Sequence, residues 1–244
     1  MMLKGERLTK RYGELLALDD VTLQVEKGEI VLVMGPSGSG KTTLLNLLAI
    51  LDRPSSGQVF LNGQQITDLT DRQAARLRNQ NFGFVFQFFH LLPELTVCEN
   101  VFLPLWIKEG KKARLSYYRK QAEELLDRFN LSSRKDAYPA QLSGGEAQRV
   151  AICRSLICQP QIVFADEPTG SIDKEAATLV LKMIQELNQE QAVSFVIASH
   201  NEIFLQLATQ VVYLRDGHLQ EKRKIMRKIN EEKTGGKDGV TDLF

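Results

Sequence analysis

Short apolar runs alternate with longer amphipathic segments along the 244-residue chain, and this pattern predicts an α/β fold. Runs of strand type occupy 29–33, 82–86, 161–165 and 194–198. A polar or glycine-rich stretch follows each run directly. Ligand-contacting side chains gather at the carboxyl ends of the strands of an α/β sheet, so we expect functional residues at these junctions.

Other segments predict smaller β-elements that flank this sheet. Segments 8–12 and 16–25, joined by a turn at Gly13, are typical of an antiparallel pair. Segments 58–63 and 211–219 contain Asn-Gly and Asp-Gly turns, which indicate hairpins. The chain therefore combines a central sheet with antiparallel additions.

Helical patterns dominate 88–159, which we interpret as a helical region inserted into the sheet. Segment 117–129 places its apolar residues on one helical face. Segment 97–107 is apolar but contains Pro104, which we expect to interrupt a helix because proline has no backbone N–H. Further helices are expected at 43–50, 71–79, 150–158 and 174–188.

An apolar cluster near the start of the helical region permits two interpretations. Its members are Phe88, Phe89, Leu91, Leu92 and Trp106. They form either part of the ordinary core or a docking groove for a partner helix.

The end of the chain is strongly basic. Residues 221–237 include seven Lys or Arg against three Glu. We therefore divide the chain into a folded domain, 1–220, and a charged tail, 221–244. The tail is either solvated or, through Ile225, Met226 and Ile229, a basic amphipathic helix at a membrane surface.

The clearest chemical signal is a glycine-rich stretch between a strand-type run and a helical run. It fits G-x-x-x-x-G-K-[ST] and consists of Gly35, Pro36, Ser37, Gly38, Ser39, Gly40, Lys41, Thr42 and Thr43. Glycines allow backbone N–H groups to turn toward a triphosphate, and the following helix directs its positive end at the same charge. We expect Lys41 to reach the β- and γ-phosphates and Thr42 to ligate Mg²⁺, so ATP and Mg²⁺ are the expected ligands.

Polar residues at three other strand ends complete a hydrolytic constellation. Asp166 is expected to hold the Mg²⁺, and Glu167 to polarise a water for attack on the γ-phosphate. His200 follows the strand-type run 194–198 and is placed to bond a γ-phosphate oxygen. Gln87 is either a ligand of the metal and the attacking water or an ordinary loop residue. Tyr12, at a predicted turn, is either a stacking platform for adenine or a packed strand end.

A second anion-binding pattern lies much later in the chain, at the start of a predicted helix. It consists of Ser143, Gly144, Gly145 and Glu146. Because the first loop already accounts for the phosphates, we interpret this site as serving the nucleotide of a neighbouring copy in a two-fold, head-to-tail homodimer. The turn that ends in Asp173 is able to reach across such a dimer. The alternative is a capped helix with a flexible entry.

Composition limits the partners and the compartment. With 31 Lys or Arg against 30 Asp or Glu, no global field favours nucleic acid, and we expect no nucleic-acid partner. Three cysteines without zinc spacing predict free thiols. The sequence has no apolar run of about 18 residues and no signal-peptide core, so we expect that the chain itself does not cross a membrane.

Taken together, these motifs resemble the ATP-binding cassette (ABC) proteins over nearly all of 3–220. The matching segments are a Walker A loop (35–42), a Q-loop residue (Gln87), a signature sequence (142–146), a Walker B strand (162–167), a D-loop (171–173) and a switch histidine (His200). Tyr12 is similar to the adenine-stacking aromatic of the family. The D-loop reads Ser-Ile-Asp, a mild departure from the usual Ser-Ala-Leu-Asp.

The resemblance implies a P-loop NTPase core with a mostly parallel sheet, an antiparallel β-subdomain and an inserted helical subdomain at about 88–159. It also implies that two ATP molecules lie between the Walker A loop of one subunit and the signature of the other. The expected partner is a separately encoded integral-membrane permease. The expected location is the cytoplasmic face of a bacterial inner membrane, with the chain bound peripherally.

Within the family, the segments around Gln87 and 99–101 look like the branch of lipoprotein-releasing, macrolide-export and cell-division ATPases. A transport subunit for lipoprotein release or efflux is thus expected. The alternatives are a cell-division type of ATPase that regulates a membrane partner without transport, and a soluble member acting in translation or DNA repair. The sequence does not identify the cargo.

Overall fold

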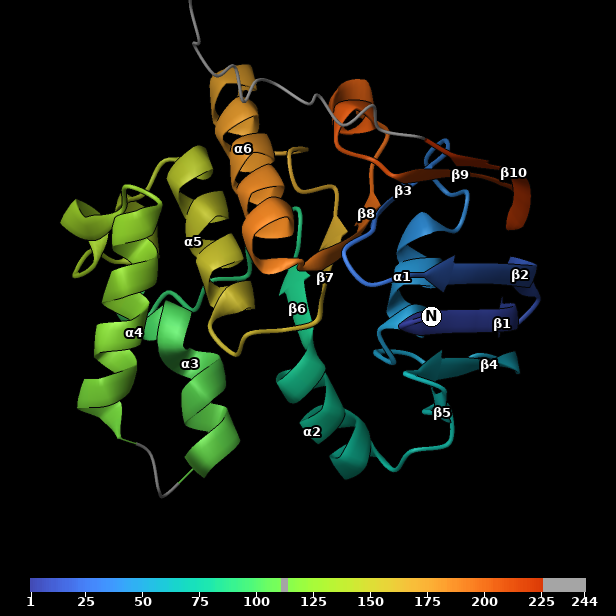
Figure 1. The fold of residues 1–244 in the computed structure, drawn as a ribbon, viewed down its shortest axis with the longest axis horizontal. Coiled ribbons are helices and arrows are strands. Elements are labelled where there is room, and N and C mark those ends of the chain that lie inside the picture. Colours follow the sequence, from blue (N-terminus) through green and yellow to red (C-terminus); the bar gives the residue numbers. More distant parts are fainter. Residues whose placement is uncertain (111–113, 226–244) are drawn as a thin grey trace, which may run out of the picture.

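A six-stranded sheet forms the centre of the computed structural model, which describes residues 1–110 and 114–225 (Figure 1). The strand order is β10-β9-β3-β8-β7-β6, and all neighbours are parallel except β10, which runs antiparallel to β9. The strands are β3 (Ile30–Met34), β6 (Phe82–Val85), β7 (Ile162–Asp166), β8 (Ser194–Ala198), β9 (Gln210–Arg215) and β10 (His218–Lys224). The expected mostly parallel sheet is confirmed.

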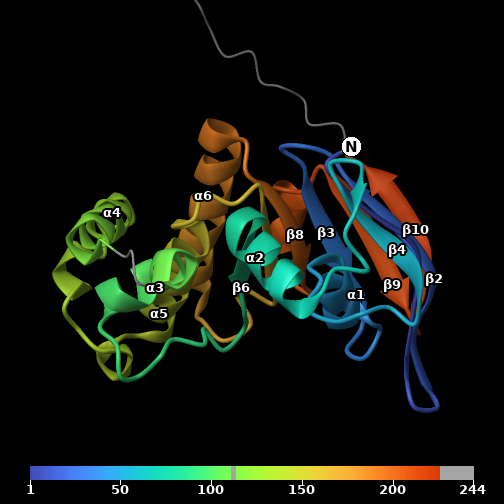
Figure 2. The same ribbon diagram turned by 90° about the horizontal axis from the view of Figure 1, so that it is seen from below.

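A second sheet is antiparallel and has the order β2-β1-β4-β5. Its strands are β1 (Leu3–Tyr12), β2 (Leu15–Val25), β4 (Ser56–Leu61) and β5 (Gln64–Gln65). Helix α1 (Lys41–Leu48) buries Leu44, Leu45, Leu47 and Leu48 in a core that it shares with both sheets. Figure 2 shows α1 beside the strands of this sheet. The expected antiparallel addition is thus present.

The central sheet is buried on both faces. In β3, Ile30, Leu32 and Met34 belong to one core, whereas Val31 and Val33 belong to the other. This alternation follows from the two-residue period of a strand. A strand covered on both faces needs apolar residues at every position, which is why it reads as a continuous apolar run.

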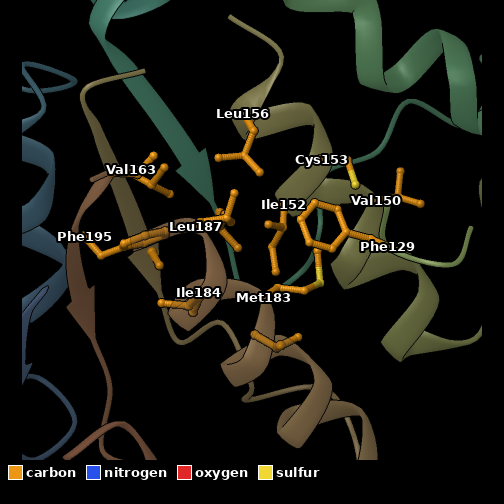
Figure 3. Packing of buried hydrophobic residues seen from close by; sticks show 14 of the residues in the cluster. Phe129, Val150, Ile152, Cys153, Leu156, Val163, Met183, Ile184, Leu187 and Phe195 are labelled. Atoms are coloured by element: carbon orange, nitrogen blue, oxygen red, sulfur yellow. The ribbon is translucent and has the colours of Figure 1, made fainter. Parts of the chain in front are cut away.

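Helices cover the face of the sheet opposite α1 (Figure 1). Helices α5 (Gly144–Leu156) and α6 (Lys174–Gln191) lie against the sheet, whereas α3 (Val97–Glu109) and α4 (Leu115–Arg128) pack against α5, and α2 (Asp71–Asn81) precedes β6. Figure 3 shows Ile152 of α5 and Leu187 of α6 in the core that these helices share with the sheet. Short 3₁₀ helices lie at Ser132–Arg134, Pro139–Gln141 and Glu202–Gln206. Among the described residues, no helix is long and apolar enough to span a membrane.

The expected interruption at Pro104 does not occur, because α3 continues through it to Glu109. Val97, Val101 and Leu105 are buried on one side of this helix, and their packing outweighs the missing N–H of the proline. The Asn79 side chain also donates to the Pro104 carbonyl at 2.9 Å.

The boundary expected at 220 is four residues too early. Strand β10 runs to Lys224, and Lys222 and Arg223 pair with Val212 and Val211 of β9. Neither a helix nor a solvated tail describes 221–224. A charged sequence is compatible with an edge strand, where Lys and Arg discourage pairing with other chains. The remainder of the expected tail, 226–244, lies outside the described residues.

The three cysteines are free thiols, as expected. Burial raises the pKa of Cys98 to about 11 and that of Cys153 to about 12. Because the thiolate is the reactive form, both thiols are unreactive at neutral pH.

Asn100 organises the loop that precedes α3. It is fully buried, and its amide nitrogen donates to the carbonyls of Leu92, Leu95 and Thr96, each at 3.0 Å. Its Oδ1 accepts from the backbone N–H of Leu92 at 2.7 Å. One side chain therefore satisfies four backbone groups.

We expect Asn100→Leu to lower the free energy of unfolding by about 2–4 kcal/mol, because buried backbone groups lose their partners. Urea denaturation measures this change, and Gln80→Leu on the exposed face of α2 is the control, with an expected effect within about 0.5 kcal/mol. Equal midpoints for the two variants would contradict the bridging role of Asn100.

Candidate functional site

Four neighbouring parallel strands end at the same edge of the central sheet. Their order is β3-β8-β7-β6, so the residues that follow them are brought together although they are far apart in the sequence. The phosphate loop, 35–43, follows β3, and Gln87 follows β6. Glu167 comes directly after β7, and His200 lies two residues beyond β8.

The phosphate loop is shaped by glycines with left-handed backbone angles. Gly35 has φ +150°, and a Cβ there would lie 2.1 Å from the Leu214 carbonyl oxygen. Gly40 has φ +99° and precedes α1, so the N-terminus of that helix opens onto the loop. The Lys41 ammonium donates to the carbonyls of Gly35 at 2.9 Å and Pro36 at 3.0 Å. Lys41 thus spans the loop from within.

The other members of the loop differ in exposure. Pro36, Ser37, Gly38 and Thr42 are exposed, and Thr43 is half-buried. Ser39 is 1% exposed, and its Oγ has no hydrogen-bond partner among the described residues. Ser39 therefore supports the loop from inside.

Tyr12 lines a pocket of about 470 Å³ together with Gly38, Gly40, Lys41 and Thr43. Its hydroxyl donates to Asp52 at 2.7 Å, and the Lys10 ammonium lies 4.8 Å from the ring centroid. The ring is 46% exposed. An exposed, anchored aromatic ring beside a phosphate-type loop is compatible with stacking on a flat base.

Thr42 and Asp166 meet in space, since the Thr42 hydroxyl donates to Asp166 Oδ2 at 2.8 Å. Burial raises the pKa of Asp166, the Glu167 carboxylate adds to this effect, and Thr42 and Lys41 oppose it. A hydroxyl and a carboxylate are the hard oxygen ligands that Mg²⁺ takes beside phosphate oxygens. A divalent cation there would offset the burial of the Asp166 charge, so these residues fit the expected metal.

Glu167 is held by three donors. Its Oε2 accepts from the Ser199 hydroxyl at 2.9 Å, and its Oε1 accepts from the His200 backbone N–H at 3.2 Å. The His200 ring nitrogen Nδ1 lies 2.9 Å from the same Oε1. The side chain of Glu167 is 15% exposed, whereas that of His200 is 71% exposed. The sequence predicted roles for Glu167 and His200, but none for Ser199.

Gln87 packs against the segment that follows Glu167. A Cβ on Gly170 would lie 3.0 Å from Gln87 Nε2. The Gly170 N–H in turn donates to the Glu167 carbonyl at 3.0 Å. Gln87 is thereby connected to the Glu167 turn rather than to open solvent.

The signature segment, 143–146, begins α5 with a complete capping box. Ser143 Oγ accepts from the Glu146 N–H at 3.2 Å, and Glu146 Oε2 accepts from the Ser143 N–H at 2.8 Å. Arg134 also donates to Glu146, at 2.8 Å. The hydrogen bond from the Ser143 backbone, assisted by Arg134, lowers the pKa of Glu146. Glu146 therefore shapes the helix start instead of contacting a ligand in the single chain.

The two signature glycines permit close packing. A Cβ on Gly145 would lie 2.5 Å from the Ala176 Cβ of α6, and one on Gly144 would lie 3.3 Å from the Ser171 carbonyl oxygen. Asp173 is the N-cap of α6, since its side chain accepts from the Ala176 N–H at 2.8 Å. Among residues 1–110 and 114–225, no hydrogen bond or ion pair joins 143–146 to the phosphate loop.

The members of the apolar cluster, Phe88, Phe89, Leu91, Leu92 and Trp106, differ in exposure, and Trp106 is 42% exposed. Phe88 is 70% exposed and Leu92 is 43% exposed, but Leu91 packs against the core. A separate apolar groove of about 390 Å³ lies between α2, β6, α3 and α5. It is lined among others by Phe84, Phe86, His90, Leu103, Pro104 and Ile107. Of 88–92, only His90 belongs to this groove. His90 and His218 are exposed, as expected.

Comparison with known proteins supports the same interpretation. The ABC transporter family model matches residues 18–170. The lipoprotein-releasing system ATP-binding protein LolD of Idiomarina loihiensis is 45% identical over 91% of this chain and 98% of the relative. The macrolide export ATP-binding/permease protein MacB of Syntrophobacter fumaroxidans is 44% identical over 89% of this chain, which spans 31% of that longer relative.

Among solved structures, a dimeric, post-hydrolysis state of the ATP-binding cassette MJ0796 bound to ADP and Pi has a TM-score of 0.86 and 37% identity. The similarity covers 93% of this chain and all of that chain. The family match, the relatives and the strand-end geometry agree with one another. The chain therefore belongs to the ABC transporter family, as an ATP-binding cassette that hydrolyses ATP.

Proposed function

We propose that the chain is the ATP-hydrolysing subunit of a transporter whose permease is a separate integral-membrane protein, serving lipoprotein release or efflux. The observation that supports ATP hydrolysis is the cluster of Thr42, Asp166, Glu167 and His200 at one edge of the sheet. The relatives named for lipoprotein release and macrolide export support a role in transport. The chain would bind peripherally at the cytoplasmic face of the membrane.

In the proposed reaction, the residues that follow each strand have different roles. Lys41 exchanges its two loop carbonyls for the β- and γ-phosphate oxygens. Mg²⁺, held by Thr42 and Asp166 with Gln87 nearby, would neutralise phosphate charge. Glu167 takes the proton of the attacking water once one of its three donors has moved away. His200, the most exposed of these donors, then bonds the γ-phosphate.

The signature segment is proposed to act on the nucleotide of a second copy. The start of α5 would serve as an anion site once the Ser143 hydroxyl leaves its capping bond, and no bond joins 143–146 to the phosphate loop in the described part of the chain. A head-to-tail homodimer places each signature on the partner's nucleotide. The dimeric cassette with ADP and Pi supports this arrangement.

The apolar groove beside β6 is the proposed docking site for a short helix of the permease. It is concave, and its lining includes Phe84, Leu103 and Ile107 but no acidic residue. The groove replaces 88–92 as the proposed contact, and His90 belongs to both. Residues of β6 form part of the groove wall, and Gln87 follows this strand two residues after its end.

Glu167→Gln is expected to lower kcat by about 10²–10⁴-fold while ATP binding persists, because the amide cannot accept the water proton. Phosphate release measures kcat, and a fluorescent ATP analogue measures binding. Glu186→Gln on the exposed face of α6 is the control. Unchanged steady-state hydrolysis would exclude Glu167 as the base.

The Ser143→Arg chain and the Lys41→Ala chain are each expected to hydrolyse no ATP alone, whereas a mixture of the two chains should hydrolyse ATP, as measured by phosphate release. A mixed dimer retains one intact site, formed by Lys41 of the first variant and Ser143 of the second. Random pairing should restore about a quarter of the wild-type sites. If the signature acts within its own chain, the mixture will stay inactive.

Ile107→Asp is expected to abolish co-purification with an integral-membrane protein and to spare the hydrolysis of the isolated chain, since Ile107 is 67% exposed. The tagged chain is recovered from solubilised membranes, and retained proteins are identified by mass spectrometry. Leu179→Asp, at a 42% exposed position of α6, is the control. Equal retention by both variants would exclude the groove as the docking site.

A further inference from the structure

Arg154, on the last turn of α5, binds the backbone that follows Gln87. Its Nη2 donates to the Phe89 carbonyl at 2.6 Å, and its Nη1 donates to the His90 carbonyl. No salt bridge involves Arg154 within residues 1–110 and 114–225. A guanidinium held only by two consecutive carbonyls is an unusual use of a charged side chain, because burying it without a counter-charge is unfavourable.

The two residues that Arg154 binds have an unfavourable backbone conformation. Phe89 has φ +57° and His90 has φ +48°. Side chains with a Cβ are disfavoured in this left-handed region. Since such a conformation persists only where the surroundings enforce it, the two hydrogen bonds from Arg154 help to hold it, together with the bond from the Phe89 N–H to the Phe86 carbonyl and the packing of the His90 ring on Phe86 at 4.9 Å.

Phe89 also contacts the opposite end of α5. A Cβ on Gly144 would lie 3.8 Å from Phe89 Cζ. Gly144 and Arg154 are ten residues apart, which is about 15 Å along a helix. Phe89 is thus attached to α5 through its ring at the signature segment and through its carbonyl at Arg154.

On its other side, the loop leads to the nucleotide site. Gln87 lies two residues before Phe89 and packs against Gly170, whose N–H donates to the Glu167 carbonyl. A change in the backbone at 89–90 therefore acts on Gln87 through a single intervening residue.

We propose that Arg154 is a positioning residue for ATP hydrolysis. By binding the Phe89 and His90 carbonyls, it fixes the position of Gln87 relative to α5. Burial lowers the pKa of Arg154, which agrees with a guanidinium held for its geometry at a cost in hydration. This inference rests on the proposed role of Gln87 at the nucleotide.

The first test compares ATP hydrolysis by the full chain carrying Arg154→Gln with that of the wild type. We expect kcat to fall roughly ten- to a hundredfold and KM for ATP to change less than about twofold, because the phosphate loop is untouched while Gln87 is displaced. Arg128→Gln is the matched control. Arg128 also belongs to the helical region, but it pairs with Glu190 at 2.6 Å, and its kcat should stay within about twofold of the wild type.

The second test separates positioning from a general loss of packing. His90→Gly, made in the Arg154→Gln chain, should raise kcat at least about threefold, because glycine adopts the left-handed conformation without the two hydrogen bonds from Arg154. Hydrogen exchange should quicken in 87–92 of Arg154→Gln and slow again in the double variant. Arg154→Lys, whose ammonium reaches one carbonyl, should lie between the wild type and Arg154→Gln.

The Gln87→Ala variant separates the proposed role of Arg154, here called the clamp, from the role of Gln87 at the nucleotide on which it rests. If Gln87→Ala lowers kcat but Arg154→Gln leaves it within twofold, the clamp is wrong and the role of Gln87 stands. If Gln87→Ala has no effect, the role of Gln87 fails. A loss in Arg154→Gln that His90→Gly does not restore would also overturn the clamp. If Arg154→Gln does not fold, the same rescue is measured on Arg154→Lys, and its absence is equally decisive.

Discussion

Parallel pairing of β3, β8, β7 and β6 is the constraint on which the rest of the structure depends. Parallel neighbours all end at one edge, so four distant segments of the chain deliver their polar residues to one place. Parallel strands also need long crossovers, which supply the helices on both faces. The site and the two-sided core are thus consequences of one pattern of hydrogen bonds.

Much of this arrangement was predictable, because its signals are local. Each buried strand is a short apolar run. Asp166, Glu167 and His200 stand at or just beyond the ends of such runs, and Lys41 stands at the end of the glycine-rich loop that follows another. The two-residue period of a strand and the glycine requirement of the phosphate loop are properties of neighbouring residues. For this reason the fold class could be inferred without coordinates.

Contacts between distant segments were not predictable in the same way. Ser199 looks like any serine after a strand until the fold places it 2.9 Å from Glu167. Nothing in the local sequence of 150–158 distinguishes Arg154, yet it binds the Phe89 carbonyl 65 positions earlier. Pro104 was expected to end a helix, because burial of the surrounding residues cannot be seen in the local sequence. Tertiary packing determines the environment of all three residues.

The hydrogen bonds at Glu167 also limit how a water molecule can reach its carboxylate. Ser199, the His200 backbone and the His200 ring engage three of the roughly four acceptor positions of its carboxylate. An attacking water must therefore use the remaining acceptor position or displace one of these donors. Of its partners, only the exposed imidazole is free to swing aside by rotation of a side chain. Rotation of the His200 ring is therefore the smallest movement that opens Glu167 to an attacking water.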